Sequence, residues 1–539
     1  MQYVAVCLFA SASLGIALVV ATPRTRPLAN VEELSESTGR QLIQRVQGGR
    51  VHQYVRAPVT RRLQWLDMLL GKYMLSKRGR PKEVKTLQLY VESYGRTPAA
   101  KGVAVGCGLT PERACATVSD ALRASTELIS PPTLVINLIG NPKDGCLISA
   151  GRTRLKVVIE RAVSLQVRAA NIKGCKYARL MYIPGFLKLY GDYTLEKQSL
   201  SLEGLLFERA ETAPPGRKLS YSVLTFASNP RSNASNSLAI SLRDCAFKLT
   251  DDVGAVQVVM KNNETLHVTL SQCNFTGVSL RSTGGSMVSS QSVYISSFGR
   301  TRIDISNSRF TNLYSATRSW SFYRQAIVRL STGKQPPIPG AVHIVNTVFE
   351  KCAANHLIDN PGFDLRVQSS SFLNNLLISD AIQTDYEKSL NVNNCVFLAN
   401  TLKSRMSGEI CFGSLEKELP DKKLPTRVMR IEGNRFERVF PDGMEMTHFQ
   451  RFTVVGYGRH RPGSRRPFDV VQLSKNEFID STVYARASVA VIRTYNVNFK
   501  MVDNIYRIGR NGTAETMTVK GKWDNTFGNP PSIFDRSPF

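Results

Sequence analysis

The sequence predicts an all-β protein whose short strands stack as a parallel solenoid, and three observations lead to this fold class. The segment from Leu238 to Phe247 is echoed, residue type by residue type, from Leu266 to Phe275. Both copies alternate apolar and polar residues over the length of one strand, and so short a unit cannot bury its apolar face alone. The spacing between such units varies, which suits a fixed strand with variable loops better than helical repeats.

The same pattern continues over most of the chain, because each unit closes on an aromatic residue. The closing residues are Phe207, Phe247, Phe275, Phe310, Phe349, Phe372, Phe397, Phe436, Phe478 and Tyr506. In every unit the residues seven and five positions earlier are apolar, as a strand with one buried face requires. The residues between these apolar pairs are all polar: Ser201, Ser241, Thr269, Asp304, His343, Arg366, Asn391, Arg430, Gln472 and Lys500. About ten or more coils, roughly 4.8 Å apart, are therefore expected.

A second column of small or polar residues stands two positions before the closing aromatic. Its members are Cys245, Cys273, Ser308, Thr347, Ser370, Cys395, Asn434, Asn476 and Asn504. We expect them to form an internal ladder at a turn, where amide side chains satisfy buried backbone groups. Cys245 and Cys273 lie one coil apart in this register, either as a disulfide or as reduced packing residues.

The chain divides into four parts. Residues 1–22 are apolar and predict a signal peptide or, since the run is long enough to span a bilayer, an uncleaved anchor. Residues 23–86 form a basic N-terminal arm in which Arg61 to Leu75 has the spacing of a short helix. Residues 87–530 form the parallel β-helix, and residues 531–539 a C-terminal tail.

An N-terminal capping helix is expected near the first coil. Thr110 can cap a helix whose first residue is Pro111, and Val118, Ala121 and Leu122 would be its buried stripe. A helix laid across the open end of a strand stack removes an edge that would otherwise promote aggregation.

Two segments resemble known families. A strand, a Gly-rich loop, the Cys107 to Cys115 turn and Thr-Val-Ser-Asp-Ala-Leu122 together resemble the first segment of right-handed parallel β-helix proteins of the pectate-lyase-like group. Phe-Leu-Asn-Asn375 and Phe-Leu-Ala-Asn400 resemble the repeats of polymorphic outer-membrane adhesins. The first resemblance implies a right-handed coil with the outer strand face available to extended glycans, as in the polysaccharide-degrading members.

The charge of the chain indicates its partners. A formal net charge of +28 and a pI near 9.9 favour polyanions such as nucleic acid, acidic glycans or anionic lipids. The signal-like start disfavours nucleic acid, and membrane contact is expected only if that segment stays uncleaved. The basic loop from Arg459 to Arg466 is the densest candidate contact; a solvated loop is the alternative. The candidate binding residues are Arg302, Arg366, Arg459, Arg461, Arg465 and Arg466.

Candidate catalytic residues lie on the predicted outer strand face. Asp304, His343 and Arg366 fall in three adjacent coils, with His267, Arg302 and Asp364 on the neighbouring row. An acid, an imidazole and a guanidinium could bind or act on an anionic sugar, whereas an ordinary solvated face mixes the same charges without function. The catalytic motifs that glycoside hydrolases and pectate lyases of this fold carry on successive coils are not evident. No zinc spacing, P-loop or dinucleotide fingerprint appears, so neither a metal nor a cofactor is expected.

Covalent features support export of the chain. Cys107 and Cys115 flank a short loop and are the better disulfide candidate in an oxidising compartment. Four Asn-x-Ser/Thr sequons are candidate glycosylation sites, at Asn233, Asn263, Asn274 and Asn511.

These observations favour a secreted or cell- or virion-surface protein without catalytic activity that adheres to acidic glycans or other polyanions. A polysaccharide lyase or glycoside hydrolase is the first alternative, and a viral or structural spike or coat rod is the second. The oligomeric state is left open.

Overall fold

The computed structural model describes most strands of the chain and the turns that join many of them. The described residues are 42–47, 50–55, 86–95, 107–127, 133–149, 155–158, 164–182, 187–190, 197–209, 221–227, 236–250, 253–261, 264–278, 291–315, 326–332, 340–384, 389–402, 408–412, 428–438, 454–457, 469–480, 492–495, 497–510 and 513–519. The chain forms two compact units, Met1–Lys82 and Glu83–Phe539.

The first unit contains a pair of strands that the sequence analysis does not predict. β1 (Leu42–Gln47) and β2 (Arg50–Val55) pair antiparallel, with Gln47 opposite Arg50. Gly48 and Gly49 between two runs of β-prone residues are the hairpin signal that could have revealed them. The apolar start at 1–22 and the helix expected over 61–75 lie outside the described residues.

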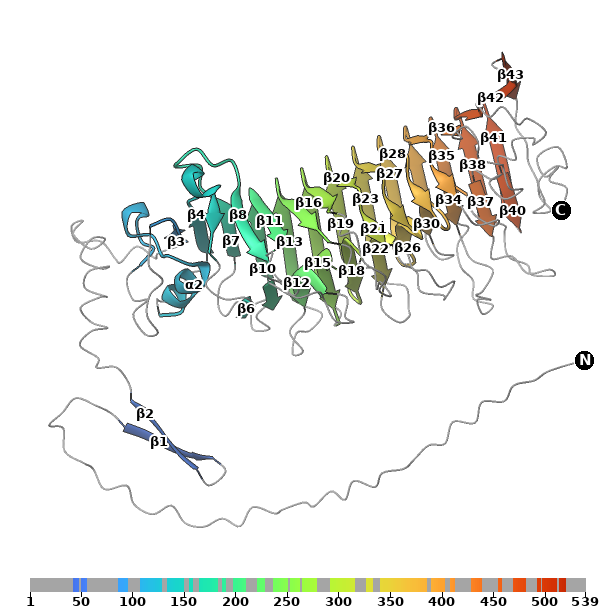
Figure 1. Cartoon of the computed structure of the whole chain (residues 1–539). Helices are drawn as coiled ribbons and strands as arrows, with labels where there is room; N and C mark the ends of the chain where they lie inside the picture. The colour runs from blue at the N-terminus through green and yellow to red at the C-terminus, as the bar shows by residue number, and fades with distance from the viewer. Residues whose placement is uncertain are drawn as a thin grey trace, which may run out of the picture. The chain divides into compact units, whose positions relative to one another are not determined.

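The second unit consists of parallel sheets through which each coil passes in turn (Figure 1). Sheet 1 comprises β3 (Thr86–Val91), β4 (Thr133–Leu138), β7 (Ser164–Ala169), β10 (Lys197–Glu203), β13 (Ser237–Arg243), β16 (Thr265–Ser271), β19 (Thr301–Ser306), β23 (Gly340–Val345), β27 (Asp364–Gln368), β31 (Leu390–Asn393), β35 (Val428–Glu432), β38 (Asp469–Ser474) and β41 (Val497–Val502). Sheet 2 comprises β5 (Leu147–Ile148), β8 (Ala178–Tyr182), β11 (Leu205–Arg209), β14 (Ala246–Leu249), β17 (Asn274–Gly277), β20 (Arg309–Thr311), β24 (Val348–Glu350), β28 (Ser371–Leu373), β32 (Val396–Leu398), β36 (Arg435–Arg438), β39 (Glu477–Asp480), β42 (Asn504–Arg510) and β43 (Thr513–Val519).

Two further sheets complete the coils. Sheet 3 comprises β6 (Leu155–Val158), β9 (Leu187–Tyr190), β12 (Tyr221–Ala227), β15 (Val253–Met260), β18 (Val293–Ser297), β22 (Ala326–Thr332), β26 (His356–Asn360), β30 (Ile382–Thr384), β34 (Ile410–Phe412), β37 (Val454–Tyr457) and β40 (Ile492–Tyr495). Sheet 4 comprises β21 (Tyr314–Ser315), β25 (Ala353–Ala354), β29 (Leu376–Leu377) and β33 (Thr401–Leu402). The predicted all-β parallel solenoid is confirmed.

The register follows the apolar pairs of the sequence. Leu200 lies opposite Ile240 and Leu202 opposite Leu242, and equivalent pairs continue from coil to coil. The closing phenylalanines, buried in sheet 2, form one continuous stack. Eight successive ring pairs from Phe207 to Phe478 have centroids 4.6 to 5.2 Å apart, in the stacked arrangement. Apolar burial and ring stacking therefore fix the same register.

A single left-handed residue turns the chain from sheet 1 into sheet 2 in ten successive coils. These residues have φ between 48° and 66° and stand three positions before the closing aromatic: Gly204, Asp244, Gln272, Asn307, Asn346, Ser369, Asn394, Gly433, Lys475 and Asp503. A side chain in this region costs about 1–2 kcal/mol, which Gly avoids and Asn or Asp tolerates best. The recurrence of this costly conformation shows that the sharp corner is a requirement of the fold.

The predicted internal ladder lies just after this corner. The backbone N–H of Asn434 donates to Asn476 Oδ1 at 3.0 Å, and the N–H of Asn476 donates to Asn504 Oδ1 at 2.9 Å. Nearer the N-terminus, Ser308 Oγ accepts from the Cys273 N–H at 3.1 Å. The side chains of Ser308, Asn476 and Asn504 thus satisfy a buried backbone donor of the preceding coil. Cys245 and Cys273 are free thiols.

The helix at the N-terminal end differs from the expected one. Thr110 and Pro111 begin only a 3₁₀ turn, η1 (Pro111–Arg113), with no side-chain cap, and the α-helix α2 (Val118–Glu127) begins later. The Cys115 N–H donates to the Tyr90 carbonyl at 2.8 Å, and this strand-like pairing stops a helix from continuing through Cys115.

Thr117 is the residue that caps α2. Its Oγ1 accepts from the Asp120 N–H at 3.0 Å and donates to the Asp120 carboxylate at 2.8 Å. Val118 and Ala121 are buried in the core that also contains Leu89, and Leu122 is partly buried against it. A second 3₁₀ turn, η2 (Pro142–Asp144), follows β4.

The last described strands depart from the parallel arrangement. β42 and β43 pair antiparallel, with Tyr506 opposite Met517. The predicted coil closing at Phe527 lies outside the described residues.

The ladder yields a stability prediction. Asn476→Ala removes the acceptor of the Asn434 N–H and amide and the donor to the Ile431 carbonyl, all of them buried. Because each orphaned buried group costs about 1–3 kcal/mol, we expect a loss of about 3 kcal/mol in the free energy of unfolding. Urea denaturation followed by circular dichroism measures it.

The matched control is Asn274→Ala at the start of β17, because Asn274 is exposed. Its effect should stay within about 0.5 kcal/mol. Both variants are compared in protein produced without glycosylation. Equal effects of the two substitutions would contradict a stabilising role for the ladder.

Candidate functional site

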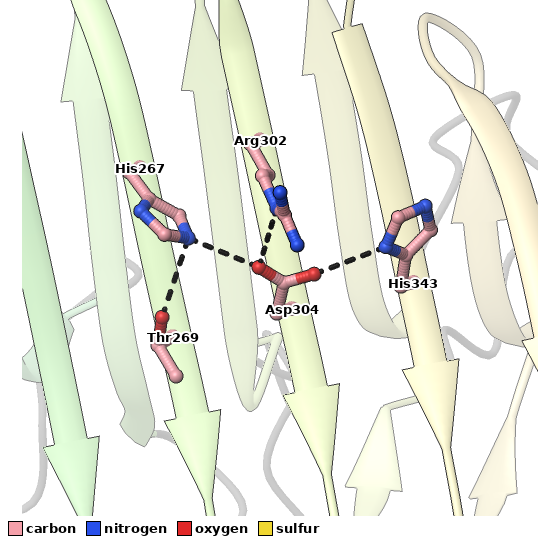
Figure 2. Close-up of polar contacts among 5 residues, drawn as sticks. All are labelled: His267, Thr269, Arg302, Asp304 and His343. Carbon is pink, nitrogen blue, oxygen red and sulfur yellow. Dashed lines mark hydrogen bonds and ion pairs between the residues drawn. The ribbon is translucent and has the colours of Figure 1, made fainter.

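Five polar side chains meet on the outer face of sheet 1, and we call them the Asp304 cluster (Figure 2). They are His267 and Thr269 from β16, Arg302 and Asp304 from β19, and His343 from β23. Alternate residues of a strand point to one face, and the parallel register sets Thr269, Asp304 and His343 opposite one another on adjacent strands. Three coils distant in sequence therefore contribute to one site.

Asp304 is the centre of the cluster. Its Oδ2 atom lies 3.0 Å from His267 Nε2 and accepts from Arg302 Nε at 2.8 Å. Its Oδ1 atom lies 3.1 Å from His343 Nδ1. The Asp304 side chain is 22% exposed, whereas Arg302 is 62% exposed. One half-buried carboxylate is thus surrounded by two imidazoles and a guanidinium.

The electrostatics of Asp304 follow from these contacts. Partial burial raises the pKa of the carboxyl, but hydrogen bonds from His267 and Arg302, with the charges of Arg302 and His343, outweigh it. The pKa of Asp304 therefore lies below its ordinary value. This carboxyl stays ionised at neutral pH, which does not suit it as a proton donor.

One contact of the cluster has the geometry of an acid–base dyad. Asp304 contacts Nδ1 of His343, and Figure 2 shows the other ring nitrogen turned away from Asp304. A carboxylate in this position orients an imidazole, as in acid–base dyads. The other ring nitrogen of His343 is therefore left for a hydrogen bond to a ligand on this face.

The other predicted residues lie apart from this cluster. Arg366 is next to His343 in the register and is exposed, but it makes no ion pair among the described residues. Asp364 accepts from the N–H and hydroxyl of Ser389 at 2.8 and 2.9 Å, so it is engaged elsewhere. The basic loop residues Arg459, Arg461, Arg465 and Arg466 lie outside the described residues.

Sequence reasoning missed a buried charged cluster in sheet 3. Arg329 lies 3.6 Å from the fully buried Asp359, and His356 Nδ1 lies 3.7 Å from Asp380 Oδ2. Burial raises the pKa of Asp380, although the charge of His356 and hydrogen bonds from Gly408 and Ser379 oppose it. The signal in the sequence is His356-Leu-Ile-Asp-Asn360, a charged strand without alternation that is buried on both faces.

The cysteines separate into two groups. Cys107 joins Cys115, the pair that the sequence favoured, and Cys146 joins Cys175 in a second disulfide that it did not indicate. Among the described residues the free cysteines are Cys245, Cys273, Cys352, Cys395 and Cys411, and all are buried. Burial raises the pKa of Cys352 and of Cys395 to about 12, as expected of packing thiols.

Of the four sequons only one has a described asparagine. Asn274 is exposed at the start of β17, and its Oδ1 accepts from the Thr276 hydroxyl at 3.3 Å. Asn233, Asn263 and Asn511 lie outside the described residues.

Comparison with known proteins adds no family. No protein-family model matches the chain, and neither a curated protein nor a solved structure matches it. In the described part of the chain, no helix is long and apolar enough to cross a membrane, and no group of three or more candidate ligands has the geometry to hold a metal ion. The candidate site is therefore defined by its geometry alone.

The Asp304 contacts predict a pH- and salt-dependent contribution to stability. Because the folded-state pKa is lowered, this contribution is fully present above the unfolded pKa of about 4 and is lost as the pH falls through the folded-state value. At pH 7 we expect Asp304→Asn to cost under about 1 kcal/mol, since solvent screens a partly exposed carboxylate.

Thermal unfolding at pH 7 and at acid pH, in low and high salt, tests this contribution. Glu203→Gln is the control, because Glu203 is more exposed and its Arg243 partner lies 3.9 Å away. A cost of Asp304→Asn that persists at acid pH would contradict the electrostatic origin.

The buried thiols yield a second prediction. At pH 8 the native protein should leave Cys352 and Cys395 unmodified by iodoacetamide, because their thiols are buried and protonated. Peptide mapping after unfolding should find both modified. Rapid modification of the native protein would show that these coils open.

Proposed function

We propose that this protein is a secreted or surface β-solenoid that binds acidic glycans without acting on them. The supporting observation is the charge balance of the outer face of sheet 1. The Asp304 carboxylate is already engaged by Arg302, His267 and His343, while Arg366 on the next strand is exposed and makes no ion pair among the described residues. The negative charge of Asp304 is compensated by its own partners. A polyanion that lies along this face therefore meets exposed cations such as Arg366.

Export is supported by covalent chemistry. The bonds Cys107–Cys115 and Cys146–Cys175 are typical of an oxidising compartment. The apolar start of the chain and the exposed Asn274 sequon agree with it. We propose the same compartment whether residues 1–22 are cleaved or remain as an anchor.

Membership of the pectate-lyase-like superfamily, with its right-handed coil, belongs to the proposal. It is supported by the stacked parallel sheets and by the Asn434, Asn476 and Asn504 ladder. A role in adhesion agrees with a protein that binds glycans without cleaving them.

A polysaccharide lyase is the second candidate, because one contact favours it. Asp304 orients His343 as a base would require, and Arg366 stands one strand further along, where it could hold a sugar carboxylate. The lowered pKa of Asp304 leaves the proton transfer to His343.

Chromatography on immobilised heparin tests the binding proposal. We expect retention into high salt, and we expect Arg302→Gln with Arg366→Gln to weaken binding about threefold per cation, the value of a partly screened ion pair. Arg113→Gln with Lys143→Gln is the control of equal charge at exposed sites outside sheet 1. Elution of the wild type in dilute salt would reject specific binding.

Depolymerisation assays separate the two candidates. Under the binding proposal, uronic-acid polymers keep their length after incubation with the protein. If they are cleaved and His343→Ala and Asp304→Ala each abolish cleavage, the lyase replaces the binding protein. Cleavage that neither substitution changes would place an activity elsewhere.

A further inference from the structure

A regular column of cations continues from the Asp304 cluster along the outer face of sheet 1. The register sets Arg366 opposite Asn391, Asn391 opposite Arg430, Arg430 opposite Gln472 and Gln472 opposite Lys500. These residues come from β27, β31, β35, β38 and β41, which are successive neighbours in sheet 1; Figure 1 labels β27, β35, β38 and β41. We call them the Arg–amide column. Cations and amides alternate in it, one residue per coil.

The spacing of this column is set by the fold. Parallel strands lie about 4.8 Å apart, so cations on every second strand recur about every 9.6 Å. Because the strand register is held by the buried apolar pairs, this period cannot change without disturbing the core. Arg366 and Arg430 are exposed and make no ion pair among the described residues, and Lys500 is half-buried.

The carboxylates beside the column are engaged by other groups. Asp364, on the strand of Arg366, accepts hydrogen bonds from Ser389. Glu432, on the strand of Arg430, pairs with Lys475 at 3.5 Å. Arg366 and Arg430 therefore have no carboxylate paired with them among the described residues, and each presents its positive charge to the solvent. At its N-terminal end the column meets His343 and then Asp304, whose charge is compensated by Arg302, so no unpaired cation of the described residues stands at the next position of the period.

The period matches one class of acidic glycan. From ordinary bond lengths, each linked pyranose advances an extended chain by about 5 Å, so a disaccharide repeats about every 10 Å. A polymer with one carboxylate per disaccharide would place an anion at each cation of the column. Its uncharged sugars would lie over Asn391 and Gln472. The Gln472 amide can donate to and accept from hydroxyl and acetamido groups, whereas Asn391 can only donate, because its Oδ1 atom is buried.

We propose that the Arg–amide column is a binding site for a glycan with one carboxylate per disaccharide, which runs across the strands along the solenoid axis. This inference rests on the proposed binding of acidic glycans and names the class bound. Three cations define three anion positions, so a hexasaccharide fills the site. The period stops at Asp304, where a further carboxylate would find no unpaired cation among the described residues.

Calorimetric titration with two hexasaccharides tests the assignment. The first alternates glucuronate with N-acetylhexosamine and carries three carboxylates; the second is hexagalacturonate, with six. We expect the wild type to bind the alternating chain about tenfold more tightly, although charge attraction alone would favour the other. An alternating octasaccharide should bind no more tightly than the hexasaccharide, and these results would support the column.

A permuted variant provides the matched control. Asn391→Arg with Arg430→Gln keeps net charge and surface composition nearly unchanged but sets two cations about 4.8 Å apart. We expect this variant to lose the preference for the alternating chain. Gln472→Arg with Arg430→Gln moves the cation in the other direction and should lose the preference too, so the test does not depend on one variant folding.

The outcomes are distinguishable. If the wild type binds hexagalacturonate more tightly, or if folded permuted variants keep the preference, the column is not the site and general glycan binding stands. If neither hexasaccharide nor heparin is bound, the proposed function fails together with this inference.

Discussion

The left-handed corner between sheet 1 and sheet 2 is the constraint on which the rest of the solenoid depends. One residue with positive φ, such as Asp244 or Asn394, turns the chain sharply and directs the next side chain inward. That inward residue would bury polar atoms at cost if it had no partner. The ladder resolves this, because Asn434 and Asn476 each accept from a backbone N–H of the preceding coil and donate to a carbonyl.

Because ten successive coils turn at the same corner, the strands of sheet 1 from β10 to β41 stay in one register. Side chains on its outer face therefore occupy fixed positions. Along a strand every second residue points outward, and perpendicular to the strands one such residue recurs on each strand. The Asp304 cluster and the Arg–amide column are both consequences of these fixed positions. Asp304 meets His267 and His343 because identical strand positions are superimposed, not because a loop brings them together.

Burial separates the charged groups of sheet 1 from those of sheet 3. Asp304 is partly exposed, and water can solvate its charged partner Arg302. The cluster can therefore contact an external ligand without leaving a buried charge unpaired. Asp359 and Asp380 are buried on a strand and turn covered on both sides, where removal of one partner leaves a charge without solvation. The first group is therefore accessible to a ligand from solvent, and the second belongs to the interior of the stack.

The apolar pairs and closing aromatics made the fold class readable from the sequence, because burial in a repeating unit leaves a period that needs no knowledge of tertiary contacts. Residue order likewise placed Asp304, His343 and Arg366 on one face. The sequence indicated the buried stripe of α2 but not its first residue, because the start of this helix depends on pairing between Cys115 and Tyr90, which are distant in the chain. It also missed the buried His356 and Asp380, since no local pattern records that both faces of a strand are covered.

Which polar residues of the outer face act together was decided by the tertiary structure alone. Only the parallel stacking joins Asp304 to its two histidines, ties Asp364 to Ser389 and leaves Arg366 exposed. The sequence by itself determined the inside and the outside of each strand through alternation. Hydrogen-bonded partners depend on which residues of neighbouring coils lie opposite each other. Loops of variable length obscure these pairs in the sequence, whereas the parallel stack aligns them.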